Sequence, residues 1–191
     1  MSVPLSRVLV VAATDRELAV SGGWRTLTCG VGPVDAAAAT AAAIAMDRPA
    51  AILHVGIAGA RRRCGLPPGT LVIGTDARYH DLAVPARLAP GTVRADAVMV
   101  AALAAAFPGA LTRPIGTSGR IGGTADTDIE AMEGFAVLRA AQLAGVAAIE
   151  VRTISNEIEE DDRARWHFVK AFAAITAATP RMVEEVARCV S

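Results

Sequence analysis

The chain has 191 residues, of which 53% are hydrophobic and 20% are charged. This fits a single globular domain over residues 1–191, long enough to bury about 70% of its unfolded surface, better than two domains. Lys plus Arg and Asp plus Glu each number 19, a formal charge of +0. Nothing therefore suggests a nucleic-acid or solvating partner, and a small ligand fits better.

Cysteine usage and the N-terminal run indicate the compartment. Cys29, Cys64 and Cys189 are odd in number, widely separated and without metal-ligand spacing, which favours reduced packing thiols and no metal site. The apolar run 8–13 is too short for a secretory signal and passes into a polar loop, as a core strand does. We expect a cytoplasmic protein with no membrane-spanning or targeting segment.

Strand-like and helix-like segments alternate along the chain. The strands are predicted at 8–13, 24–29, 51–56, 70–75, 111–117 and 147–155, and the helices at 33–46, 93–107, 132–144 and 163–179. This order predicts an α/β fold with a mostly parallel sheet covered by helices on both faces.

Polar clusters interrupt this apolar framework where strands should end. Glu17 follows the first strand, although a lone acid at a helix start is also favoured by the helix dipole. Residues 55–60 (Val-Gly-Ile-Ala-Gly-Ala) read as a strand entering a glycine turn, whose N–H groups can face an anion or a sugar hydroxyl. Residues 76–81 (Asp-Ala-Arg-Tyr-His-Asp) are densely polar and are equally consistent with a solvated loop.

Glu133 and Asn156 form the last cluster. Glu133 opens an otherwise apolar helix, and Asn156 ends the last strand. Ligands of open α/β sheets bind beyond the carboxyl ends of strands, which places Asn156 beside a ligand. The structural alternatives are a helix-start acid and a helix N-cap.

Together these clusters resemble the nucleoside phosphorylase and nucleosidase superfamily over nearly the whole chain, in particular its methylthioadenosine/S-adenosylhomocysteine nucleosidase branch. The matching segments are 14–17 (Thr-Asp-Arg-Glu), 29–32 (Cys-Gly-Val-Gly), 55–59, 76–81, 132–133 (Met-Glu) and 152–156 (Arg-Thr-Ile-Ser-Asn). The string at 76–81 is the most specific match. The resemblance implies a three-layer sandwich around a central mixed, mostly parallel β-sheet, and a homodimer or higher homo-oligomer.

Two departures refine the resemblance. Asn156 stands where the methylthioadenosine enzymes have Asp, and Ile57 stands where they have Ser. With its flanking segments, Asn156 makes the chain look like the futalosine hydrolases of the alternative menaquinone pathway, which release hypoxanthine from an inosine-like nucleoside. An Asn amide can donate to O6 and accept from protonated N7 of a 6-oxopurine, whereas a protonated Asp suits adenine. The amide can also rotate to pair with adenine.

The resemblance also implies roles for individual residues. Glu133 would hold the ribose hydroxyls, Glu17 would activate water, and Asn156 would bind the departing purine, without any cofactor or metal. Further substrate contacts are expected from Ile57, Ser118, Met132, Arg152 and Trp166. Segment 118–123 lacks the aromatic residue that covers the purine in the methylthioadenosine enzymes. Candidates for binding an aryl carboxylate tail are Arg78, Arg120 and Arg165.

Several alternatives stay open at this point. A nucleosidase acting on aminodeoxyfutalosine, methylthioadenosine or S-adenosylhomocysteine differs only through Asn156. A purine nucleoside phosphorylase needs an anion cradle, which the Arg triplet 61–63 could supply, although the loop after the first strand is acidic. A non-catalytic nucleoside sensor would be expected to lack Glu17 or Glu133. An oxidoreductase is disfavoured because the third glycine of the dinucleotide fingerprint is missing.

Overall fold

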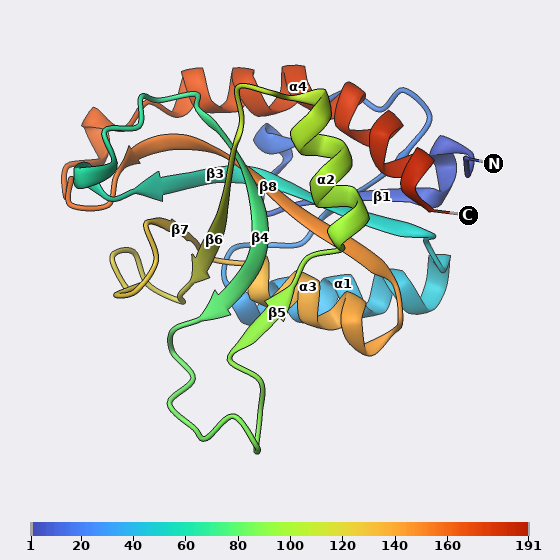
Figure 1. Cartoon of the computed structure of the whole chain (residues 1–191), viewed down its shortest axis with the longest axis horizontal. Helices are drawn as coiled ribbons and strands as arrows, with labels where there is room; N and C mark the ends of the chain where they lie inside the picture. The colour runs from blue at the N-terminus through green and yellow to red at the C-terminus, as the bar shows by residue number, and fades with distance from the viewer. Residues whose placement is uncertain (1, 191) are drawn as a thin grey trace.

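The computed structural model describes residues 2–190 and contains one mixed β-sheet between two pairs of helices (Figure 1). The strands are β1 (Val8–Ala12), β2 (Arg25–Thr28), β3 (Ala51–Ala60), β4 (Leu71–Tyr79), β5 (Thr92–Arg94), β6 (Leu111–Thr117), β7 (Ile129–Ala131) and β8 (Ala147–Glu157). The α-helices are α1 (Pro33–Asp47), α2 (Ala97–Ala106), α3 (Gly134–Leu143) and α4 (Phe168–Cys189). Single 3-10 turns lie at Leu5–Arg7, Asp15–Glu17, Arg62–Cys64 and Arg163–Arg165.

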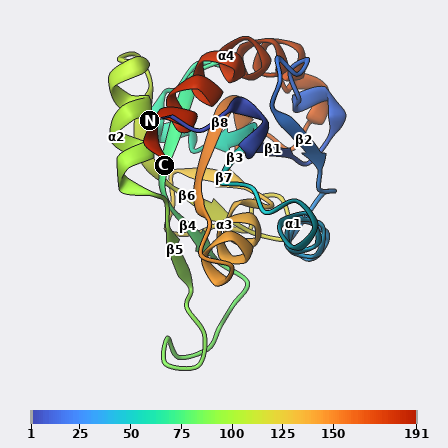
Figure 2. The same cartoon turned by 90° about the vertical axis from the view of Figure 1, so that its right-hand side faces the viewer.

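The helices form the outer layers of a sandwich. Helix α1 packs against α3 below the sheet, and α2 packs against α4 on the opposite side, as both views show (Figures 1 and 2). The predicted three-layer α/β sandwich is therefore confirmed. Among residues 2–190, no helix is long and apolar enough to span a bilayer.

The sheet is mixed and partly closed. Five strand pairings are parallel (β1–β2, β1–β3, β3–β8, β4–β6 and β6–β7), and three are antiparallel (β3–β7, β4–β5 and β4–β8). Because β8 pairs with both β3 and β4, the strands β3, β7, β6, β4 and β8 close into a ring. A small hydrophobic cluster lies inside this ring, and all of its buried residues come from these five strands. The ring therefore has a hydrophobic core of its own.

Several predicted boundaries were wrong. The segment 93–107 was predicted as one helix, but it begins as β5, and α2 starts only after Asp96, whose carboxylate caps the N–H groups of Val98 and Met99. The helix predicted at 163–179 begins at Phe168 and continues through Pro180 to Cys189. The short strands β5 and β7 were not predicted.

The glycine turn predicted at residues 55–60 is also wrong. These residues continue β3 to Ala60, with a register shift between Ala58 and Gly59 where β3 pairs with β8. Strand β8 likewise runs past Asn156 to Glu157. Long neighbouring strands therefore carry Ile57, Arg152 and Asn156, which are held more rigidly than residues of a turn.

Candidate active site

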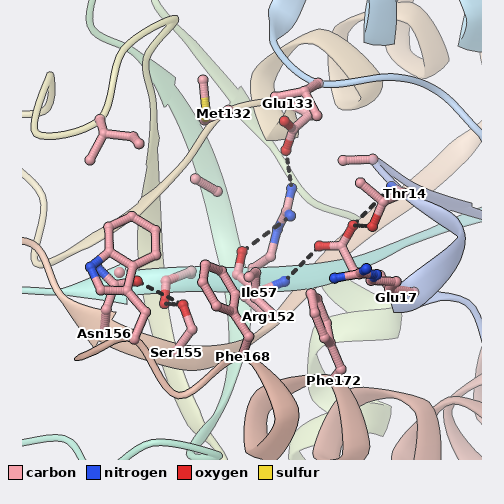
Figure 3. Close-up of a pocket in the computed structure, with 18 of the residues that line it drawn as sticks. Thr14, Glu17, Ile57, Met132, Glu133, Arg152, Ser155, Asn156, Phe168 and Phe172 are labelled. Carbon is pink, nitrogen blue, oxygen red and sulfur yellow. Dashed lines mark hydrogen bonds and ion pairs between the residues drawn. The ribbon is translucent and has the colours of Figure 1, made fainter. Parts of the chain in front are cut away.

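The candidate site is a cavity of about 670 Å³ over the carboxyl ends of β1, β3 and β8. Seven of the eight predicted site residues line it: Glu17, Ile57, Met132, Glu133, Arg152, Asn156 and Trp166. Figure 3 shows Glu17 and Asn156 on opposite sides of Ile57 and Arg152, with Glu133 reaching in from another wall. Residues more than a hundred positions apart in sequence thus meet in one pocket.

Glu17 is fixed in the short helix that follows β1. One of its carboxylate oxygens accepts hydrogen bonds from the backbone N–H and the hydroxyl of Thr14, both at 2.9 Å. The other oxygen accepts from the backbone N–H of Ile57 at 3.1 Å. The side chain is only 3% exposed. Hydrogen bonds to both oxygens hold the carboxylate in one orientation.

Glu133 lies directly before α3 and is held from two sides. Its Oε1 accepts from the backbone N–H of Gly32 at 3.0 Å, and its Oε2 pairs with the Arg152 guanidinium at 3.3 Å. Gly32 has a φ of 92°, a left-handed conformation that favours glycine, and it directly precedes α1. This turn aims a backbone donor at a buried carboxylate.

Arg152 is 1% exposed and is enclosed by polar partners. Its Nε donates to Glu150 at 2.8 Å, a second nitrogen donates to the carbonyl of Ile57 at 3.4 Å, and the third contacts both Glu133 and Nε2 of His54. His54 donates from Nδ1 to the carbonyl of Val11 at 3.0 Å, so Nε2 is its acceptor. Burial and then the Arg152 charge hold the pKa of His54 well below its usual range, so His54 is neutral.

Asn156 is held in a defined orientation. Its Oδ1 accepts from the hydroxyl of Ser155 at 2.7 Å, and its Nδ2 donates to the carbonyl of Glu157 at 2.8 Å. Rotation of the amide would place Oδ1 against that carbonyl oxygen, which is unfavourable because both are acceptors. The free rotation expected from the sequence is therefore opposed by Glu157. One N–H and one lone pair of the amide remain for a ligand.

Aromatic side chains form another wall of the pocket. Trp166 contacts Phe168 with ring centroids 5.5 Å apart, and Phe168 stacks on Phe172 at 6.0 Å. The indole N–H donates to the carbonyl of Glu160, and the Arg163 guanidinium lies 5.3 Å from the centre of the Trp166 ring. These rings suit a flat apolar group, and Arg163 adds a positive charge beside them.

Ser118 is the predicted site residue that the structure does not bring into the pocket. It is fully buried, and its hydroxyl donates to Asp81 at 3.0 Å instead of reaching the cavity. Ile121, from the same segment, lines the cavity in its place. Glu130 ties this segment down by accepting from the backbone N–H groups of Gly122 and Thr124. An aliphatic side chain thus stands in the segment that lacks an aromatic residue.

The three arginines expected to bind a substrate tail also lie outside the cavity lining. Arg78 pairs with Asp76 at 2.7 Å, and Arg165 pairs with Glu160 at 3.3 Å. Arg120 does not line the cavity either. The arginines that do line it, besides Arg152, are Arg16 and Arg163, both exposed.

Comparison with known proteins identifies the family. Residues 18–126 match the model of the phosphorylase superfamily. Over 186 residues the chain is 36% identical to a futalosine hydrolase of Streptomyces coelicolor, covering 84% of this chain and 78% of the relative. It is 30% identical to a futalosine hydrolase of Thermus thermophilus, covering 85% and 82%. The chain belongs to the futalosine hydrolase family of the phosphorylase superfamily. It is an N-glycosyl hydrolase.

Solved structures agree on the fold of this hydrolase. A methylthioadenosine/S-adenosylhomocysteine nucleosidase of Colwellia psychrerythraea, solved with adenine, superposes with a TM-score of 0.82 at 17% identity, covering 94% of this chain and 95% of that one. The futalosine hydrolase of Helicobacter pylori gives 0.79 at 16% identity, covering 93% and 97%. The nucleoside phosphorylase-like architecture is therefore shared with both.

Several residues that line or support the candidate site were not predicted from the sequence. Phe168 and Phe172 are four residues apart at the start of α4, a spacing that places them on one helix face and was a usable signal. Glu150 lies two residues before Arg152, so both side chains point to the same face of β8. His54 on β3 is the register partner of Glu150. Glu150 and His54 both lie within strongly apolar strands, and the sequence has no pattern there that marks a buried polar residue as a partner of Arg152.

Proposed function

We propose that this hydrolase cleaves the N-ribosidic bond of futalosine with water, releasing hypoxanthine and leaving dehypoxanthine futalosine. The observation that carries the proposal is the fixed amide of Asn156 in a pocket that also holds two buried carboxylates, Glu17 and Glu133. The sequence identity with two futalosine hydrolases supports the same substrate.

Asn156 supplies the contact to the leaving group. Its remaining N–H donates to O6 of the purine, and its Oδ1 accepts from N7 once N7 has taken a proton from solvent. As the bond from C1′ to N9 breaks, its electron pair stays with the purine, so basicity grows at N7. The hydrogen bond to protonated N7 strengthens as the bond breaks and so favours the transition state.

Glu133 supplies the contact to the sugar. Its carboxylate accepts hydrogen bonds from the ribose 2′- and 3′-hydroxyls, while Gly32 and Arg152 keep it from turning away. The ribosyl centre becomes oxocarbenium-like when the purine leaves. A fixed negative charge on the sugar side stabilises that positive charge without reorganisation.

Glu17 supplies the base. It accepts a proton from a water molecule while the water oxygen bonds to C1′, so that the sugar gains a hydroxyl group and the carboxylate gains the proton. Thr14 donates hydrogen bonds to one carboxylate oxygen and Ile57 donates to the other. These bonds fix the direction of the lone pairs that remain for the water. General-base assistance of this kind contributes about 10²–10⁴-fold.

Water is favoured over phosphate as the nucleophile by the charges of the loops. The triplet 61–63, the candidate anion cradle, is already paired: Arg61 with Glu159, Arg62 with Glu157, and Arg63 with Asp128. None of the three lines the cavity, whereas Asp15 and Glu17 do. These two carboxylates place negative charge in the cavity lining, which disfavours phosphate.

The test is release of free base by the purified protein in phosphate-free buffer. Futalosine, aminodeoxyfutalosine, methylthioadenosine and inosine are incubated separately, and the products are separated by chromatography, with the Glu17→Gln variant as the inactive control. We expect hypoxanthine from futalosine and much slower release of adenine from the two adenine nucleosides. Preferential release of adenine would contradict the role of Asn156, and a requirement for phosphate would contradict hydrolysis.

A further inference from the structure

The rear face of the Arg152 guanidinium is held by two groups that do not reach the pocket. Glu150 and His54 are both fully buried, and neither lines the cavity. Glu150 accepts from Arg152 Nε at 2.8 Å, and its second oxygen has no hydrogen-bond partner. A buried carboxylate with an unused oxygen is costly, so a role beyond packing is expected of it.

The backbone leaves space for this network at two glycines. A Cβ on Gly134 would collide with the Glu150 carboxylate, and a Cβ on Gly56 would collide with Arg152 and lie 2.7 Å from Glu17. Gly134 is the first residue of α3, so Glu150 faces the positive end of a helix dipole. Both glycines are therefore explained by the side chains of the network.

The charges of the network decide what Glu150 does. Glu17 and Glu133 face the pocket, while Glu150 faces Arg152 from behind. His54, on β3, is neutral and offers Arg152 no charge. Among residues 2–190, Glu150 is thus the only carboxylate that pairs with Arg152 on the side away from the pocket. Its negative charge offsets the positive charge of Arg152 from that side.

We propose that Glu150 is a positioning residue for hydrolysis, which orients Arg152 and neutralises it from behind so that Arg152 fixes Glu133 without cancelling the negative field at the ribosyl centre. This inference rests on the roles proposed above for Glu17 and Glu133. Without the Glu150 charge, Arg152 would draw Glu133 toward itself and reduce the field that favours an oxocarbenium-like centre.

The experiment measures kcat and kcat/KM from pH 4.5 to 9 with futalosine for the wild type, Glu150→Gln and Glu150→Asp. Glu184→Gln is the matched control, because it removes a carboxylate from an exposed pair with Arg188 on α4. For Glu150→Gln we expect kcat to fall on the order of 10-fold, the effect of one charge across about 10 Å at an effective dielectric of ~20. The acidic limb of kcat/KM should move to lower pH, because removing a negative charge makes the remaining carboxylates harder to protonate.

Glu150→Asp keeps the charge and shortens its reach, so it should lower kcat while leaving the acidic limb in place. An unmoved limb in Glu150→Gln, with the loss equal at every pH, would reduce Glu150 to a packing residue and overturn the inference. If Glu150→Gln does not fold, Glu150→Asp decides, and a wild-type kcat in that variant overturns the inference. A wild-type protein that releases base from no nucleoside would instead refute the proposed function itself.

Discussion

The two ends of the pocket are built in different ways. At the carboxylate end, Glu17, Glu133 and Arg152 are almost completely buried, and each is bonded to backbone groups or to another charge. At the aromatic end, Arg163 is exposed, Trp166 is only partly buried, and Ile121 is 49% exposed. The carboxylate end is tied to β3 and β8 by buried hydrogen bonds, and the aromatic end is formed by a loop and a helix start.

This difference indicates a division of labour. Groups that must be held rigidly against developing charge gain from buried hydrogen bonds, because preorganisation avoids reorganisation during the reaction. Groups that select a substrate can vary on loops without disturbing the sheet. Asn156 belongs to β8 and lies on the opposite side of Arg152 from Glu17 (Figure 3). Substitutions at the two ends should therefore have different kinetic signatures.

The largest effect is expected at the carboxylate end. Glu17→Gln keeps the shape and removes the proposed base, so kcat should fall by about 10²–10⁴-fold for every nucleoside that the protein cleaves. The Gln oxygen can keep the contact with Thr14 or the contact with Ile57 but not both, because the NH2 group cannot accept from a backbone N–H, so a modest rise in KM is expected as well. Steady-state kinetics on two nucleosides measure this. A loss confined to one nucleoside would mean that Glu17 selects the substrate.

A smaller and selective effect is expected at Asn156. Asn156→Asp places an acid that can be protonated where the amide donates to a 6-oxo group, and it should shift the ratio of kcat/KM from futalosine toward aminodeoxyfutalosine. One mismatched buried polar pair costs about 1–3 kcal/mol, so the ratio should change by roughly 5- to 150-fold. Competition between the two nucleosides in one vessel measures the ratio. Equal losses on both substrates would show that Asn156 does not read the base.

A still smaller effect is expected at the aromatic wall. Trp166→Ala removes a flat surface and should raise KM for futalosine by about 5- to 10-fold with little change in kcat, because stacking is lost equally from ground and transition states. Trp166→Phe should restore most of the affinity, since Phe168 still has an aromatic neighbour. A fall in kcat that Phe does not rescue would instead assign Trp166 to the chemistry.

The same division explains what the sequence could predict. Glu17, Glu133 and Asn156 were found because each interrupts an apolar pattern near the end of a strand. Glu150 and His54 were missed because they sit inside apolar strands. Glu150 lies two residues before Arg152 on the same face of β8, and the pairing of β3 with β8 brings His54 to Arg152.

The errors have similar causes. Ser118 was misplaced because its hydroxyl turns toward Asp81, a residue 37 positions away that no local pattern connects with it. The helix predicted at 93–107 was too long because β5 is stabilised by pairing with β4, which tertiary structure supplies and local composition does not. The layers of the fold and the sheet edge that carries the site can be predicted from local sequence patterns. The direction in which a side chain points depends on partners that are distant in sequence.

The smallest predicted effect concerns stability. It tests whether the buried charge of Glu150 destabilises the fold. Burial raises the pKa of Glu150 above its ordinary value of 4.5, and the ion pair with Arg152 opposes that rise. A folded-state pKa that is raised means that folding favours the protonated acid. The resulting stabilisation is complete below the ordinary pKa and is lost as pH rises through the folded-state value. Gln is a neutral substitute and does not titrate.

The difference in Tm between Glu150→Gln and the wild type should therefore become more favourable to the variant as pH rises from 4.5 to 8. Thermal unfolding at four pH values measures it, with Glu184→Gln as the exposed control whose difference should stay nearly flat. Any fixed cost of burying the amide cancels, because it is the same at every pH. A difference that falls with pH would mean that the Arg152 pair outweighs burial, and that Glu150 stabilises the fold in its charged form.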